Sequence, residues 1–240
     1  MLQRITDALL SVVYPSQCQI CSSIVDRSSD GAACGDCWDK TRIFSGSEVL
    51  CDKCGAFLRE TKSSAIVSCH QCEDQHYDRA RAIGVYHYAL SASVIDLKRS
   101  PHIPSKIREL LFATLERSSF TDSTLVVPVP LSAKRSVERG FNQAGVIANI
   151  LAKETNIPFD ELSLVRKIHT PMHRVAMDKK ARDLTVRNAF EVKRPKLIAG
   201  HDILLVDDVF TSGATVSYCA KVLKKNGARK VNVLTLARAV

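Results

Sequence analysis

Two adjacent carboxylates follow a short apolar run near the C-terminal end of this 240-residue chain. Asp207 and Asp208 come directly after that run, and a loop of small and hydroxyl-bearing residues follows them: Thr211, Ser212, Gly213, Ala214 and Thr215. Carboxylates accept hydrogen bonds from sugar hydroxyls or hold Mg²⁺ against a diphosphate. Such a loop at a helix N-terminus favours a phosphate, because the first amides of the helix are unpaired. The stretch therefore predicts a site for a ribose that carries a 5′-phosphate.

Eight of the nine cysteines form four pairs with a two-residue spacer. The pairs are Cys18 with Cys21, Cys34 with Cys37, Cys51 with Cys54, and Cys69 with Cys72. A tight turn aims both sulfurs of such a pair at one ion, and two pairs complete a tetrahedral zinc site. We expect two structural zinc sites in two consecutive ribbons, although a cross-braced arrangement of alternating pairs would use the same cysteines. The ninth, Cys219, is expected to be a small core residue of a helix.

The charge of the chain divides at about residue 78. Residues 1–78 have seven Lys and Arg against eleven Asp and Glu, a net charge of −4, whereas residues 79–240 have 27 against 14, a net charge of +13. The basic part attracts polyanions, either phosphorylated metabolites or nucleic acid. We expect an N-terminal helix and double zinc ribbon over residues 1–78 and a ligand-binding domain over residues 79–240. The acidity of the ribbons favours a protein partner over DNA for them.

The second part of the chain alternates between strand and helix patterns. Strands are expected over residues 82–88, 124–130, 203–206 and 231–237, and helices over residues 104–118, 140–154 and 215–226. This alternation predicts an α/β fold with a parallel sheet. It places the acid pair at the carboxyl edge of a central strand, where such sheets bind ligands.

The N-terminal residues 1–14 are read as a cytosolic amphipathic helix, because their apolar part is short and no cleavage site follows it. No apolar run approaches the roughly 18 to 20 residues that a membrane span requires. Nothing in the N-terminus exports the chain, so disulfides are not expected. We therefore predict a cytoplasmic protein without membrane insertion.

The acid pair and its loop differ from the two commoner nucleotide-binding loops, since the sequence has neither GxxxxGK[ST] nor GxGxxG after a strand. They resemble the signature of type I phosphoribosyltransferases, which has four apolar residues, two acids and a Thr/Ser-Gly-x-Thr loop. The resemblance implies a Rossmann-like domain in which the acids bind the ribose hydroxyls of phosphoribosyl diphosphate. The loop would bind the 5′-phosphate, and Mg²⁺ would accompany the diphosphate.

A second motif narrows the family. Residues 126–144 contain RGFNQ at positions 139–143, and with the cysteine module in front they resemble the ComF family of competence proteins, which includes ComFC-like proteins. That family is associated with DNA uptake in naturally competent bacteria, and the resemblance covers nearly the whole chain. Two departures are visible. Ser212 replaces a usual Thr and keeps the hydroxyl, whereas TPMH at residues 170–173 replaces Thr-x-x-Gln and leaves the role of His173 open.

The same resemblance suggests cations for the diphosphate. Lys98 and Arg99 follow the first strand, where relatives place a diphosphate-binding loop, although the pair could equally be a solvated helix end. Arg174 lies near the centre of the basic segment 166–187, which in relatives closes over the substrate, although such a charge run could also be a solvated surface. During transfer these three cations would stabilise the departing diphosphate. No side chain is recognisable as a general base.

Three residues of the RGFNQ motif are further candidates for ligand contact. Arg139, Asn142 and Gln143 start a helix near the carboxyl edge of the sheet, and their donors suit a phosphate or a nucleobase. Arg139 could instead have a structural role. No pocket aromatic identifies the acceptor, so the phosphoribosyl site does not define the reaction.

Three functional classes fit these residues. The first is an active phosphoribosyltransferase that acts on a base, a nucleotide or an amine. The second is a phosphoribosyl-binding scaffold that handles single-stranded DNA and docks DNA-uptake proteins through its ribbons. The third is a regulator that senses phosphoribosyl diphosphate or a related nucleotide without turnover. The sequence leaves the choice between them open, together with the oligomeric state.

Overall fold

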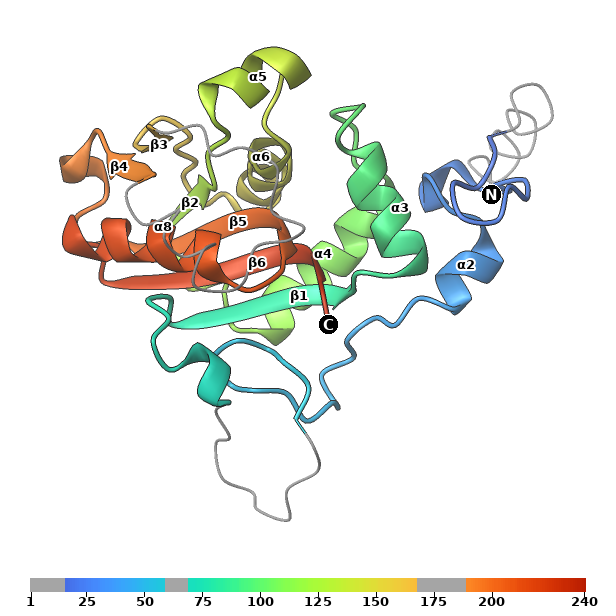
Figure 1. The fold of residues 1–240 in the computed structure, drawn as a ribbon, viewed down its shortest axis with the longest axis horizontal. Coiled ribbons are helices and arrows are strands. Elements are labelled where there is room, and N and C mark those ends of the chain that lie inside the picture. The colour runs from blue at the N-terminus through green and yellow to red at the C-terminus, as the bar shows by residue number, and fades with distance from the viewer. Residues whose placement is uncertain (1–15, 59–68, 168–188) are drawn as a thin grey trace.

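The computed structural model describes residues 16–58, 69–167 and 189–240. Its centre is a four-stranded, fully parallel sheet in the order β1-β6-β5-β2 (Figure 1). The strands are β1 (Arg79–Val85), β6 (Lys230–Arg238), β5 (Asp202–Phe210) and β2 (Leu125–Pro128). Two shorter strands, β3 (Leu164–Arg166) and β4 (Phe190–Val192), form a separate antiparallel pair. The predicted α/β fold with a parallel sheet is confirmed.

The helices in the described part of the chain include three that the sequence predicts: α4 (Ser105–Arg117), α6 (Gln143–Thr155) and α8 (Ala214–Lys225). The others are α2 (Gly35–Asp39), α3 (Tyr88–Asp96) and α5 (Ala133–Arg139), with short 3-10 turns at η1 (Ser28–Asp30), η2 (His70–Cys72) and η3 (Pro195–Leu197). The predicted end of the strand over residues 82–88 was wrong, because β1 ends at Val85 and Tyr88 begins α3. The helix expected over residues 1–14 lies outside the described residues. Within those residues, none of the helices combines the length and apolarity needed to cross a bilayer.

The two faces of the sheet bury separate cores, as the alternation of side chains along β5 shows. Leu204 and Val206 pack with α3, α4 and α6 on one face. Ile203 and Leu205 pack with α8 on the other. Successive residues of a strand point to opposite faces, so a continuously apolar strand needs helices on both sides. This sandwich fixes β5 and therefore the acid pair at its end.

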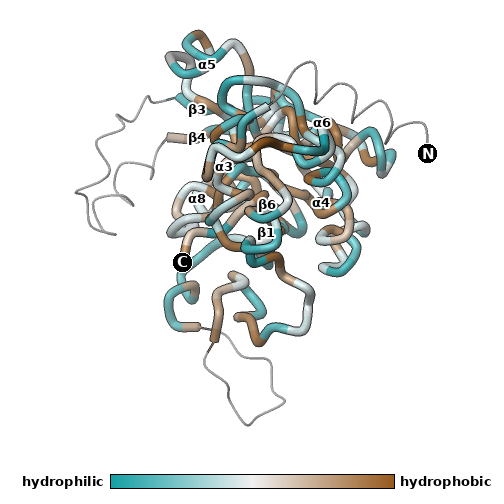
Figure 2. Tube along the Cα trace, turned by 90° about the vertical axis from the view of Figure 1, so that its right-hand side faces the viewer, coloured by the Kyte–Doolittle hydropathy of each residue, from teal (hydrophilic) through white to brown (hydrophobic). Residues whose placement is uncertain are grey.

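Each cysteine-rich segment joins one of these two cores. The first ribbon (residues 16–41) contributes buried Trp38 to the core of α3 and α4. The second ribbon (residues 49–58 and 69–78) contributes Cys51 to the core of α8. Figure 1 shows the first ribbon beside α3 and the second below β1, and Figure 2 shows the second ribbon again below β1, at the end opposite α5. Both ribbons are thus built onto the parallel domain.

The chain between the ribbons extends the sheet at its β1 edge. The N–H of Phe44 donates to the carbonyl of Ile83 at 2.8 Å, and the N–H of Val85 donates to the carbonyl of Arg42 at 2.9 Å. Gly84 lies between these bonds, pairs antiparallel with Ile43 and permits the close approach. A Cβ at residue 84 would overlap the Arg42 carbonyl oxygen and lie 2.9 Å from Cδ1 of Leu90.

We expect Gly84→Ala to lower the free energy of unfolding by about 1–3 kcal/mol, because neither the Arg42 backbone nor the Leu90 side chain has room to move. Urea denaturation measures the change. Gly35→Ala is the matched control, since a Cβ at residue 35 would have no other atom within 4 Å. Equal free energies of unfolding for the two variants would show that the chain between the ribbons does not pack closely against Gly84 of β1.

Candidate functional site

A cavity of about 430 Å³ lies where the carboxyl ends of the parallel strands meet. Tyr86 follows β1, Val129 follows β2, Asp208 lies near the end of β5 and Ala239 follows β6, and all four line the cavity. Open parallel sheets bind ligands at this edge, because the loops after the strands converge there. The position predicted for the site therefore coincides with a real cavity.

The structure brings most of the predicted ligand-binding residues to this cavity. Those that line it are Lys98, Arg139, Asn142, Gln143, Asp207, Asp208, Thr211 and Thr215. Ser212, Gly213 and Ala214 belong to the same loop but are not part of the cavity wall, and Arg99 is exposed outside it. Arg174 and His173 lie outside the described residues. Of the two adjacent cations after the first strand, only Lys98 faces the site.

The acid pair is held by backbone amides of its own strand. Oδ1 of Asp207 accepts from the N–H of Asp208 at 3.0 Å, and Oδ1 of Asp208 accepts from the N–H of Val209 at 2.7 Å. Burial at the base of the cavity, and then the adjacent Asp208 carboxylate, raise the pKa of Asp207 well above its ordinary value. The Asp208 amide and the Arg166 guanidinium oppose this rise without cancelling it. A ligand that brings hydroxyl donors or a divalent cation relieves the repulsion between the two carboxylates.

The loop after β5 depends on a glycine. Gly213 has a φ of +77°, a left-handed conformation, and a Cβ there would lie 2.7 Å from Cζ of Phe210. The turn leads directly into α8, whose first amides have no partner in a preceding turn. The N–H of Ala214 donates to Oγ of Ser212 at 3.4 Å. Thr211 and Thr215 line the cavity beside these amides, which makes the loop suited to an oxyanion.

The RGFNQ motif is partly used for internal contacts. Nδ2 of Asn142 donates to the carbonyl of Val129 at 3.1 Å, which ties the start of α6 to the end of β2. Nη1 of Arg139 donates to Oε1 of Gln143 at 2.6 Å. Gln143 is only 2% exposed, and its Nε2 has no hydrogen-bond partner in the described structure. Arg139 and Gln143 therefore act as one unit in the cavity wall, whereas the amide nitrogen of Asn142 is already occupied.

Three polar residues of the cavity wall were not among the predicted ligand-binding residues: Tyr86, Arg135 and Arg166. Arg135 lies one helical turn before Arg139 in α5, a helix the sequence reading missed after Pro128 and Pro130. Arg166 ends β3 and lies over the Phe190 ring at 5.4 Å. Of the two described residues of the basic segment 166–187, Arg166 and Lys167, Arg166 lines the cavity. Tyr86 directly follows β1, and the rule that parallel strands end at one edge could have found it. Lys98, Arg135, Arg139 and Arg166 give the wall four cations against two carboxylates.

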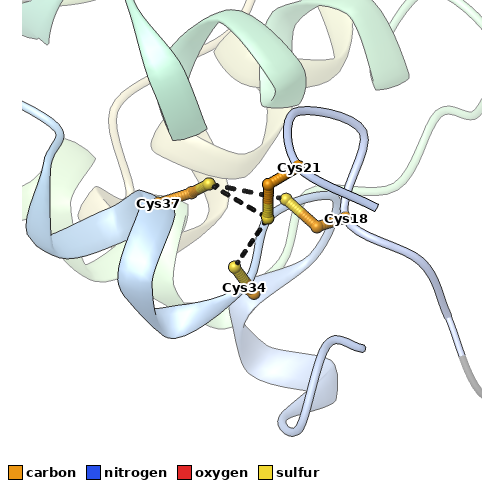
Figure 3. A group of neighbouring side chains, drawn as sticks. All are labelled: Cys18, Cys21, Cys34 and Cys37. Carbon is orange, nitrogen blue, oxygen red and sulfur yellow. Dashed lines mark hydrogen bonds between the residues drawn. The ribbon is translucent and has the colours of Figure 1, made fainter. Parts of the chain in front are cut away.

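The cysteines gather into two separate groups of four, made of consecutive pairs. Cys18, Cys21, Cys34 and Cys37 form one group (Figure 3), and Cys51, Cys54, Cys69 and Cys72 form the other. This is the consecutive arrangement, not the cross-braced alternative. Sulfur pairs lie 3.5–3.7 Å apart, whereas sulfurs bound tetrahedrally to zinc lie about 3.8 Å apart and disulfide sulfurs about 2.05 Å apart.

Backbone amides support both groups in a way that suits a metal-bound thiolate. The N–H of Ile20 donates to Sγ of Cys18 at 3.4 Å, and the N–H groups of Cys54 and Cys69 donate to Sγ of Cys51 at 3.5 and 3.3 Å. Each group thus fits one zinc ion. Cys219 lies apart, fully buried in α8, and the prediction that it is a core residue is confirmed.

Family models match both parts of the chain. A double zinc ribbon domain matches residues 9–74, and a phosphoribosyl transferase domain matches residues 138–239. DNA utilization protein YhgH of Escherichia coli K12 is 30% identical over 95% of this chain and 100% of its own length. Competence protein F of Haemophilus influenzae is 28% identical over 86% of this chain and 90% of its own. The chain belongs to the ComF family.

The solved structures that match include a purine phosphoribosyltransferase from Pyrococcus horikoshii, with 15% identity and a TM-score of 0.35 over 60% of this chain and 92% of that one. In this ComF-family chain, the region that matches the phosphoribosyl transferase family model runs from residue 138 to residue 239. It therefore includes the RGFNQ motif and the acid pair with its loop. Tyr86 and Lys98 also line the cavity but precede the matched region, Tyr86 directly after β1 and Lys98 shortly after α3.

We expect the ComF-family chain to hold two zinc ions, one in each cysteine group. Cys34→Ser should lower the zinc content from two ions to one, because each group supplies its own four ligands. Native mass spectrometry measures the content. Cys219→Ser is the control that should keep both ions, and retention of two ions by Cys34→Ser would argue against this ligand set.

Proposed function

We propose that this ComF-family protein binds phosphoribosyl diphosphate together with Mg²⁺ in the cavity at the carboxyl edge of the sheet. The observation that supports this most is the joining of the acid pair and the loop before α8 in one cavity. On this proposal the loop holds the 5′-phosphate, and Asp207 and Asp208 hold the ribose hydroxyls. The volume of about 430 Å³ is typical of small-molecule sites, which span roughly 300–1,000 Å³.

The charges of the cavity wall suit the diphosphate end of the ligand. Lys98, Arg135, Arg139 and Arg166 outnumber the two carboxylates, so the wall favours a ligand with several negative charges. Mg²⁺ bound to the diphosphate would share oxygens of Asp207 and Asp208, the carboxylates in the described cavity wall, with the ribose hydroxyls and would neutralise part of that charge. Arg174, outside the described residues, stays a candidate for the same role.

The reaction that such a site supports is displacement of diphosphate by a nitrogen nucleophile. The nitrogen lone pair forms a bond to C1 of the ribose, and the C1–O bond to the diphosphate breaks. The electron pair of that bond leaves with the diphosphate, and the nitrogen gives up a proton to solvent. The wall cations stabilise the departing charge. A scaffold or a regulator would bind the same ligand and release no diphosphate.

Calorimetric titration with phosphoribosyl diphosphate and Mg²⁺ tests whether the cavity binds this ligand, as the transferase, the scaffold and the regulator would all do. We expect Asp208→Asn to weaken binding at least about 10-fold, because hydrogen bonds to charged groups contribute roughly 1.5–3 kcal/mol. Asp202→Asn is the matched control, since Asp202 begins the same strand and pairs with Arg229 at 2.6 Å, far along β5 from the cavity. Equal affinities for Asp208→Asn and the unmodified chain would refute the proposed ribose site.

Diphosphate release measured across a panel of bases, nucleotides and amines then separates the functional classes. If the unmodified chain releases diphosphate and Asp208→Asn abolishes this release, the protein is a transferase. Binding without release identifies a scaffold or regulator. The names of the relatives, competence protein F and DNA utilization protein, favour a role in the uptake or use of DNA. We place that role in the cytoplasm, with the ribbons available to a protein of the uptake machinery.

A second candidate function, binding of single-stranded DNA, is favoured by a basic groove between α8 and the β3–β4 pair. Lys167, Lys221 and Lys225 line this groove of about 620 Å³, and Glu191 is the one acidic residue among its described lining residues. Lys167 pairs with Glu191, whereas Lys221 and Lys225 are exposed one helical turn apart on α8. Two cations at this spacing can contact neighbouring phosphates of a strand, and phosphate contacts dominate such binding.

Fluorescence anisotropy with a labelled oligonucleotide at several salt concentrations tests the DNA function. Lys221→Ala with Lys225→Ala should weaken binding and reduce the slope of log affinity against log salt by about 1.4, since each phosphate contact on a single strand contributes about 0.7. Lys153→Ala on α6, which covers the other face of the sheet, is the control. An unchanged slope in the double variant would remove α8 from the DNA-binding surface.

A further inference from the structure

The loop proposed to hold the phosphate rests on a single aromatic ring. Cα of Gly213 lies so close to Phe210 that an added Cβ would be 2.7 Å from Cζ and 3.3 Å from Cε1 of the ring. Phe210 is 4% exposed and ends β5, directly before the loop. The path of the loop therefore depends on where the Phe210 ring lies.

The position of that ring is set by the second ribbon and the end of β6. Tyr77 of the ribbon packs edge-to-face against Phe210, with centroids 5.9 Å apart and planes at 81°. The Arg238 guanidinium lies 4.6 Å from the centroid of the Phe210 ring. Nη1 of Arg238 also donates to the carbonyl of Cys54 at 2.5 Å, and Nη2 lies 3.9 Å from its sulfur. Arg238 thus joins a cysteine of the second group directly to the ring under the loop.

A second contact reaches the first turn of α8. The N–H of His76, in the second ribbon, donates to Oγ of Ser217 at 3.0 Å. The N–H of Ser217 donates in turn to the carbonyl of Gly213 at 2.9 Å. Two independent routes, one through side-chain packing and one through hydrogen bonds, therefore lead from the second ribbon to the same glycine.

The first ribbon makes no comparable contact with the loop in the described structure. It lies against the opposite face of the sheet, where Lys106 of α4 sits 4.6 Å from the Trp38 ring and pairs with Asp30 at 3.2 Å. The oxygen of Thr41 accepts from the N–H of Ala89 in α3 at 3.0 Å. This ribbon supports α3 and α4 instead.

We propose that Tyr77, Phe210 and Arg238 are positioning residues that hold the phosphate loop against the second ribbon, so that affinity for a sugar phosphate depends on the second cysteine group and not on the first. The inference rests on the proposed function, since it assigns the loop to a phosphate. Edge-to-face aromatic pairs and cation–ring contacts have preferred geometries, so they can hold the Phe210 ring in one orientation. The second ribbon is then part of the ligand site although it does not line the cavity.

Titration with ribose 5-phosphate and, separately, with inorganic diphosphate tests the proposal. Arg238→Met keeps the aliphatic stem and loses both guanidinium contacts, so ribose 5-phosphate should bind about 10-fold more weakly, as neighbouring residues couple by roughly 0.5–3 kcal/mol. Diphosphate binds at the cationic wall and should keep its affinity. Tyr77→Leu should behave like Arg238→Met, and Tyr77→Phe, which keeps the ring, should behave like the unmodified chain.

Lys106→Met is the matched control, because it removes the corresponding cation–ring contact of the first ribbon. It should leave the affinity for ribose 5-phosphate within about twofold, inside the error expected for distant, independent sites. An equal loss in Lys106→Met and Arg238→Met, or a parallel loss of diphosphate affinity, would reduce the effect to general destabilisation and overturn the proposal.

Hydrogen exchange in the ligand-free protein separates this inference from the proposed function. Amides of residues 211–217 should exchange faster in Arg238→Met than in Lys106→Met, while the zinc content stays at two ions in both. If the unmodified chain binds neither ribose 5-phosphate nor phosphoribosyl diphosphate, the proposed function fails, and the exchange comparison still decides whether the ribbon positions the loop. Unchanged exchange at these amides would reject the positioning role.

Discussion

Two neighbouring, half-buried carboxylates near the end of β5 are the constraint on which the site depends. Asp207 and Asp208 repel each other, and burial adds to the cost of ionising Asp207. The strand offsets part of this with two backbone amides, and Arg166 supplies a nearby positive charge. Both carboxylates line a cavity whose wall also carries four cations, Lys98, Arg135, Arg139 and Arg166. Two adjacent carboxylates at its end do not stabilise a strand that serves only as core. They are useful in a strand that binds a hydroxylated, phosphorylated ligand.

The cysteine groups and the parallel domain stabilise each other. Each ribbon has a small apolar surface of its own, yet Trp38 is buried with α4 and Cys51 is buried with α8. The chain between the ribbons adds an antiparallel partner to β1, so the exposed edge of the sheet is covered. Metal binding in the ribbons therefore contributes to more than the folding of the ribbons themselves, because it fixes the segments that close both cores.

Much of this architecture can be predicted from the sequence, because the signals are local. The two-residue spacers of the cysteines, the periodicity of α4 and α6, and the acids after an apolar strand each lie within one element. The misses depend on distant contacts. Arg79 and Arg81 are not typical strand residues, yet they belong to β1, where they pair with Asn232 and Leu234 of β6. Their guanidinium groups both donate to Asp52 of the second ribbon. The helix α5 follows two prolines and has no apolar face to reveal it, and so Arg135 was overlooked.

The acidity of the N-terminal part also has an explanation inside the chain. Three of its acids meet cations of the basic part: Asp30 with Lys106, Asp52 with Arg79 and Arg81, and Asp78 with Lys224, at 2.8–3.4 Å. The pairs of Asp52 and Asp78 are half-exposed and contribute little stability singly, whereas Asp30 is buried. Their signs are complementary, as expected for a segment of −4 that packs on a domain of +13. Charge that already serves this internal docking does not by itself indicate an external protein partner. On α8, Lys224 pairs with Asp78 of the second ribbon, whereas Lys221 and Lys225 in the basic groove stay exposed. Docking of the acidic ribbons therefore leaves these two cations of the domain exposed.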